Sequence, residues 1–206
     1  MDNNPPGNVA ADFYEKVNYE GERTTYSINE NHDFSPKKIV DLYQSVKVGT
    51  GVKVICWNEP DIDGSYADVR GRQPEIKNLT FNHLSIDDTD THIVSFKFVD
   101  KTSNNKGDYS LTVKLHNSDQ RIILSNEGDY YKIAGKFRAS DGEVTTAISV
   151  RNVHTGEYLT TGSIYFVWNS DAGSVDIASE ADWPKQLEHQ QDGPTKFTIT
   201  LVSNKP

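Results

Sequence analysis

Residues 13–21 read FYEKVNYEG, and residues 54–64 read VICWNEPDIDG. In each stretch an aromatic residue is followed seven positions later by glycine, first as Tyr14 and Gly21 and then as Trp57 and Gly64. A hairpin that folds back over its own sheet brings the glycine at its tip beside the aromatic at its start, where glycine takes a positive φ at little cost. Two copies 43 residues apart, each followed by another strand-like run, predict a pair of Greek-key motifs.

Alternation of apolar and polar residues, which is typical of strands, runs through the chain, whereas helical periodicity is confined to residues 36–43. In the first half we expect strands at 11–16, 24–28, 45–48, 52–57, 67–69 and 79–81. In the second half we expect them at 93–99, 109–115, 121–124, 130–137, 144–150, 163–168, 174–177 and 197–202. This second series of short strands separated by turns indicates an immunoglobulin-like sandwich, although no cysteine pair bridges its sheets.

The halves do not repeat each other, so the sequence predicts an all-β chain with two different β-sandwich domains. Residues 1–10 are expected to form a flexible arm and residues 11–86 the Greek-key domain. An acidic stretch at 87–92 is expected to be a linker, followed by the sandwich at 93–206.

The composition limits the classes of function. The 206 residues carry a net charge of −9, which disfavours binding to a nucleic-acid backbone and unaided adhesion to anionic lipid. Mean hydropathy is −0.65, and no apolar run approaches the roughly 18 residues of a membrane-spanning helix. The N-terminus lacks the basic and apolar regions of a secretory signal. Cys56 is the only cysteine, so we expect it to pack in the core.

Catalytic motifs are missing from the sequence. There is no G-x-S-x-G, Walker or G-x-G-x-x-G pattern, and the six histidines have no partners at metal-ligand spacing. The sequence therefore favours a protein that is not an enzyme.

Two acidic segments supply candidate oxygen donors for Ca²⁺, which takes six to eight oxygen ligands. Residues 59–64 copy the start of an EF-hand loop, but Arg70 stands where the last ligand belongs; Asp61 and Asp63 are kept as candidate donors. Asp87, Asp88 and Asp90 lie at the expected domain junction, where a cation would relieve their mutual repulsion. The alternative for residues 59–64 is a solvated turn without a cation. The alternative for Asp87, Asp88 and Asp90 is a soluble hinge.

The first half resembles a βγ-crystallin domain, whose Greek keys carry the aromatic-x6-Gly signature. The resemblance implies Ca²⁺ binding through a motif N/D-N/D-x-x-S/T-S that precedes a strand. Residues 40–45 read VDLYQS, of which Asp41 and Ser45 match that motif. The second equivalent falls at residues 76–81, IKNLTF, where only Thr80 fits. The other specified positions of both stretches depart from the motif.

The whole chain resembles the calcium-dependent cell-adhesion molecule of social amoebae, which joins a βγ-crystallin-like domain to an immunoglobulin-like domain. Segments that carry this resemblance are VDKTSNNKGDY at 99–109, VRNVHT at 150–155, GSIYF at 162–166 and WPK at 183–185. The resemblance implies calcium-dependent homophilic adhesion between cells. It also implies a protein found in the cytoplasm and at the cell surface, exported without a signal peptide and held peripherally by a membrane-anchoring protein partner.

Two other functions remain open at this point. One is a cytoplasmic structural or stress protein of the crystallin type, which would be monomeric. The other is a carbohydrate-binding module in which Tyr130, Tyr131 or Trp183 stacks on a sugar.

Overall fold

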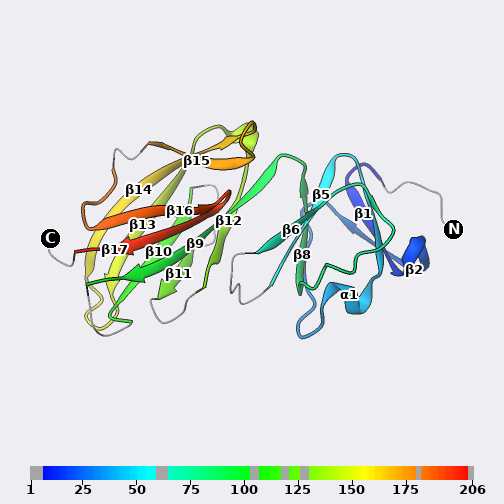
Figure 1. Cartoon of the computed structure of the whole chain (residues 1–206), viewed down its shortest axis with the longest axis horizontal. Helices are drawn as coiled ribbons and strands as arrows, with labels where there is room; N and C mark the ends of the chain where they lie inside the picture. The colour runs from blue at the N-terminus through cyan, green and yellow to red at the C-terminus, as the bar shows by residue number, and fades with distance from the viewer. Residues whose placement is uncertain are drawn as a thin grey trace. The chain divides into compact units, whose positions relative to one another are not determined.

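The structure is a computed structural model that describes residues 7–58, 65–102, 107–116, 121–125, 130–179 and 182–203. It divides into two compact units, with the division between Thr89 and Asp90. Strands form nearly all of the regular structure in both units (Figure 1). The predicted all-β fold class with two sandwich domains is confirmed.

The first unit contains two four-stranded sheets, ordered β2-β1-β4-β7 and β3-β8-β5-β6. Within this unit, β1 to β4 form the first Greek key and β5 to β8 form the second. The third strand of each key, β3 or β7, joins the sheet built by the other key, so the two keys interlock. The elements are β1 (Ala10–Lys16), a 3₁₀ turn η1 (Val17–Tyr19), β2 (Glu20–Ser27), β3 (Asn31–Asp33), α1 (Ile39–Leu42), β4 (Ser45–Val48), β5 (Val52–Trp57), β6 (Tyr66–Val69), β7 (Arg72–Gln73) and β8 (His83–Asp88).

Alternating apolar residues of the central strands form the core of the first unit. Phe13 on β1 is fully buried and packs against Tyr26 and Tyr43, with ring centroids 5.6 and 5.2 Å away. Cys56 on β5 belongs to the same core, as expected, and burial raises the pKa of its thiol.

The first aromatic–glycine pair marks the β1–β2 hairpin. Gly21 has a φ of 82°, and a Cβ there would lie 3.2 Å from Cβ of Glu15, so this position favours glycine on both counts. Tyr14 is 1% exposed and meets the ring of Tyr19 edge to face at 5.8 Å. The glycine of the second pair, Gly64, lies outside the described residues.

The second unit is a sandwich of a five-stranded and a four-stranded sheet, ordered β11-β10-β13-β14-β15 and β12-β9-β17-β16. All described pairs are antiparallel except β9 with β17, which is parallel. Phe96, Phe166 and Phe197 join the two sheets in the core. The elements are β9 (Thr91–Asp100), β10 (Tyr109–Leu115), β11 (Ile122–Ser125), β12 (Lys132–Arg138), η2 (Ala139–Asp141), β13 (Val144–Asn152), β14 (Tyr158–Asn169), β15 (Ser174–Ser179), β16 (Leu187–Gly193) and β17 (Lys196–Leu201).

The expected acidic linker at 87–92 differs from the structure. Strand β8 includes Asp87 and Asp88, and β9 begins at Thr91, so only two residues separate the strands. The strand expected at 79–81 is also absent, because the pairing with β5 begins at His83. Asp87 is compatible with a strand because it accepts a hydrogen bond from the Ser85 hydroxyl at 2.6 Å.

Candidate functional site

Ser45, a candidate calcium ligand, is fully buried at the start of β4. Its hydroxyl donates a hydrogen bond to the carbonyl of Lys16 at 2.6 Å and accepts one from the backbone N–H of Tyr19 at 3.0 Å. These two bonds fasten the folded β1–β2 hairpin onto β4. Nearby, the ammonium of Lys47 lies 5.1 Å from the ring centroid of Tyr14.

Asp41, the other residue that matches the crystallin motif, is exposed on α1. Its carboxylate accepts a hydrogen bond from the backbone N–H of Lys38 at 2.7 Å and so satisfies a free donor at the start of the helix. Among the described residues, no group of three or more His, Cys, Asp or Glu side chains converges as a metal site. Asp41 and Ser45 alone do not supply the six to eight oxygens that Ca²⁺ takes.

The strand register identifies the counterpart of Ser45 in the second Greek key. Ser45 lies opposite Tyr14, and the equivalent partner of Trp57 is His83, whereas the motif at 76–81 puts Phe81 in this position. The His83 ring stacks on Trp57 with centroids 5.6 Å apart. Its Nδ1 lies 2.9 Å from Oδ1 of Asn82, so an imidazole takes the position that a serine holds in the first key. Sequence reasoning missed His83 because it placed the second motif two residues too early.

The remaining acidic candidates are distributed over separate contacts. Asp87 is bonded to Ser85 within the first unit, and Asp88 pairs with Val52 in the β5–β8 register. Asp90 belongs to the second unit, where its carboxylate accepts the Ser140 hydroxyl at 2.7 Å; this bond holds the pKa of Asp90 below its usual value.

The other two candidates, Asp61 and Asp63, lie outside the described residues. The structure therefore gives no contacts for the loop that copies the start of an EF-hand.

The aromatic candidates for sugar binding are held by neighbouring groups. The indole N–H of Trp183 donates to the carbonyl of Leu187 at 2.8 Å, and the side chain packs against the core of the second unit. Tyr131 donates its hydroxyl to Asp192 at 3.0 Å, and the ammonium of Lys132 lies 5.6 Å from the ring of Tyr130. None of these contacts favours an open stacking platform.

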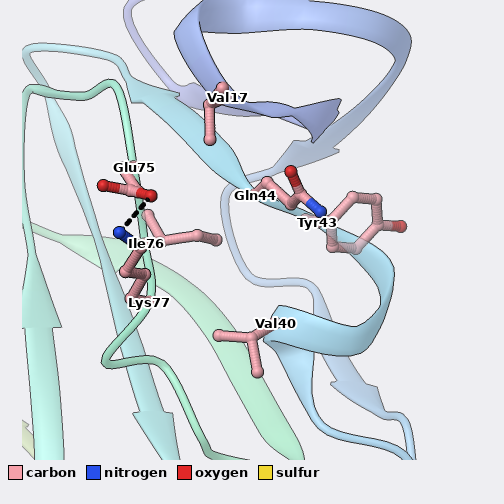
Figure 2. Close-up of a pocket in the computed structure, with 7 residues that line it drawn as sticks. All are labelled: Val17, Val40, Tyr43, Gln44, Glu75, Ile76 and Lys77. Atoms are coloured by element: carbon pink, nitrogen blue, oxygen red, sulfur yellow. Dashed lines mark ion pairs between the residues drawn. The ribbon is translucent and has the colours of Figure 1, made fainter.

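A pocket of about 290 Å³ lies in the first unit, where the two Greek keys meet. Figure 2 shows Val17, Val40 and Ile76 among the residues that line it, together with the Glu75–Lys77 ion pair, whose N–O distance is 2.8 Å. The backbone N–H of Ile76 donates to the carbonyl of Gln44 at 3.0 Å and fixes one side of the pocket. Its lining suits the docking of an apolar side chain with charged groups at the margin.

Replacing Ser45 with alanine is expected to destabilise the first unit by about 1–3 kcal/mol, because the Tyr19 N–H and the Lys16 carbonyl both lose their partner. The measurement is thermal unfolding of the full chain. The matched control is Ser27→Ala, an exposed serine on β2, for which a change within about 0.5 kcal/mol is expected. Equal unfolding temperatures for the two variants would contradict the role given to Ser45.

Two family models match adjoining parts of the chain. A beta/gamma-crystallin model matches residues 8–85, and a membrane-binding model matches residues 94–202. No match was found among curated proteins. In the described residues, no helix has the length and apolar character needed to cross a membrane.

Solved structures include a relative that spans nearly the full chain. The crystal structure of the abundant perithecial protein of Neurospora crassa is 36% identical, covers 98% of this chain and 100% of that one, and superposes with a TM-score of 0.69. A βγ-crystallin domain of the same Neurospora protein, solved in a Ca²⁺-bound form, is 28% identical and covers 45% of this chain and 100% of that one, with a TM-score of 0.37.

The comparisons support the crystallin resemblance and do not show the narrower one to the social-amoeba adhesion molecule. The membrane-binding model covers more than half of the chain, and the Neurospora relative aligns over its whole length. The chain belongs to the membrane-binding family through its second unit and, over its full length, to the family of the abundant perithecial protein.

Proposed function

We propose that this chain attaches peripherally to a membrane through its second unit and holds cells together by self-association of its first unit. The observation that carries the proposal is the membrane-binding match at 94–202, which includes nearly all of β9 through β17. Homophilic binding, calcium dependence, a location at the cell surface and a membrane-anchoring protein partner are finer parts of the proposal. They derive from the resemblance to the adhesion family.

The pocket in Figure 2 is the contact that we assign to a second copy of the chain. Val17 is 36% exposed at its opening, which gives each copy an apolar side chain to insert. In a two-fold interface the same patch meets itself. Because Glu75 and Lys77 form an ion pair within each copy, the margin of the patch carries no net charge that opposes pairing with a second copy.

In this proposal Ca²⁺ promotes self-association by reducing the electrostatic repulsion between copies of the chain. Two copies that each carry a net charge of −9 repel one another where their acidic groups come within about 8 Å, and a divalent cation reduces that repulsion. Chelation should therefore weaken self-association. A site formed by Asp41 and Ser45 is not needed for this effect of Ca²⁺.

Sedimentation of the full chain in millimolar Ca²⁺ tests self-association. The wild type is expected to sediment as a concentration-dependent dimer or larger species, and Val17→Glu as a monomer, because the new carboxylate would be buried beside Glu75. The matched control is Val202→Glu, since Val202 is 37% exposed in the second unit. A wild type that stays monomeric at every concentration contradicts adhesion and favours the alternative of a monomeric structural protein.

A further inference from the structure

The outward face of the five-stranded sheet in the second unit carries a groove of about 600 Å³. Its floor consists of short side chains from β10, β13 and β14. Thr112 pairs with Ser149, which pairs with Thr161, and Ala147 pairs with Ser163 in the next row. The neighbouring residues Val113, Ile148 and Ile164 are buried, so these short side chains point away from the core. We call this surface the outer groove.

One wall of the outer groove comes from the segment that precedes β16. A Cβ on Gly162 would lie 2.7 Å from the Pro184 ring, so glycine allows this segment to lie directly against β14. Asp182 lines the same wall, and its carboxylate accepts the hydroxyl of Tyr165 at 2.9 Å. This wall of the groove therefore depends on the close approach of residues 182–184 to Gly162.

Three exposed cations line the outer groove: Lys114, Arg121 and Arg151. Arg121 immediately precedes Ile122, the cross-strand partner of Val113, which places it beside Lys114. Arg151 lies opposite Ser110, about 13 Å farther along the strand direction. None of the three forms an ion pair with a described residue, in contrast to Lys53, Arg70 and Lys77 of the first unit.

Adjacent like charges are unfavourable on a sheet unless an anion compensates them. The net charge of the chain does not supply that compensation from a distance, since charges farther away than about 8 Å are largely screened at physiological ionic strength. The net charge of −9, which disfavours unaided adhesion to anionic lipid, is therefore outweighed locally by the outer groove.

Large side chains with apolar surface stand beside these cations. Ile123 is 52% exposed and Tyr158 is 67% exposed, and both line the outer groove. Tyrosine with its apolar ring and polar hydroxyl is enriched where a protein meets the bilayer interface. Basic and apolar groups on one face match an anionic bilayer, whose surface offers phosphate oxygens above acyl chains.

We propose that the outer groove is the surface through which the second unit contacts anionic phospholipid directly. This inference rests on the proposed function and adds to it the face, the residues and the lipid class. Lys114 and Arg121 bind phosphate at one end of the groove, Arg151 binds at the other, and Ile123 and Tyr158 enter the interface.

Co-sedimentation of the full chain with vesicles tests the proposal at physiological salt. The wild type is expected to bind vesicles of phosphatidylcholine with phosphatidylserine, and to bind pure phosphatidylcholine much more weakly. The K114Q/R121Q/R151Q variant is expected to bind the mixed vesicles roughly 100-fold more weakly, at about 1 kcal/mol for each cation lost. All three side chains are exposed, so unfolding temperatures should match those of the wild type.

The matched control is K37Q/R72Q/K101Q, which removes three exposed cations from other surfaces and changes the net charge equally. It is expected to bind like the wild type. Equal losses in the two triple variants, or equal wild-type binding to both kinds of vesicle, would overturn the outer groove while leaving membrane attachment intact. A wild type that binds neither vesicle would overturn the groove and leave attachment through a membrane-anchoring protein partner as the form of the proposed function. If the wild type bound acidic glycans but not vesicles, and the K114Q/R121Q/R151Q variant lost the glycan binding, the ligand of the outer groove would be a sugar and the lipid proposal would be wrong.

Discussion

The Phe166→Ala variant is expected to lose about 3–5 kcal/mol of unfolding free energy in the second unit. Phe166 on β14 is 1% exposed, and its ring centroid lies 5.8 Å from that of Phe96 and 5.1 Å from that of Phe197. Because the partners lie on β9 and β17, this ring joins the two sheets of the sandwich. Truncation removes the contact and leaves a cavity that close-packed neighbours fill only in part.

Calorimetry of the full chain measures this effect. The unfolding transition of the second unit should move to a lower temperature, and the transition of the first unit should stay where it is in the wild type. The matched control is Tyr158→Ala, an aromatic on the same strand that is 67% exposed; its unfolding free energy should change by less than about 0.5 kcal/mol. Similar shifts for the two variants would show that the aromatic cluster does not hold the sheets together.

The second large effect is expected from Asp68→Asn in the first unit. The Lys53 side chain is 2% exposed, and its ammonium lies 2.9 Å from a carboxylate oxygen of Asp68. Arg70 binds the other oxygen at 3.0 Å. Removing the carboxylate charge leaves a buried ammonium with a weaker partner, at a cost of about 2–3 kcal/mol. This lies below the usual 3–5 kcal/mol because Asp68 is itself 31% exposed.

A second substitution separates the lost pair from a general packing defect. The double variant K53M/D68N removes the buried charge and keeps an unbranched apolar side chain, so it should recover most of the lost stability. Denaturant unfolding of the three proteins measures this. A double variant as unstable as Asp68→Asn would indicate that the carboxylate acts through some contact other than Lys53.

The same pair predicts the acid stability of the first unit. Burial alone raises the pKa of Asp68, but hydrogen bonds from Arg70 and Lys53 outweigh it and hold the pKa below its ordinary value. A lowered pKa gives stability that is present above the ordinary value, near 3.9, and is lost as the pH falls through the lowered one. Stability of the wild type should therefore fall below about pH 4 more steeply than that of Asp68→Asn.

Most of the apolar strands could be predicted from the sequence, whereas β8 and the short polar strands could not. Strands β4 and β5 begin and end at the predicted residues, and nearly every residue in them is buried. Strand β16 was missed because it lies at a sheet edge and buries only Leu187. Strands β3 and β7 have three and two residues, too few for a period to show.

The candidate site was harder to predict because contacts, rather than residue types, decide it. The motif at 40–45 locates Ser45, but only the structure reveals that the hairpin backbone occupies its hydroxyl. His83 follows from extending the register across both Greek keys. The cations of the outer groove stand at positions 114, 121 and 151, and strand pairing alone brings them to one face.

Clustering of vesicles by the full chain tests the central claim most directly, since it needs membrane attachment and self-association together. Light scattering of vesicles containing phosphatidylserine is expected to rise on addition of wild-type protein with Ca²⁺, and to fall on chelation. The Val17→Glu variant should bind the vesicles without clustering them. Vesicles that bind the wild type yet never cluster, at any protein or Ca²⁺ concentration, would contradict an adhesive function.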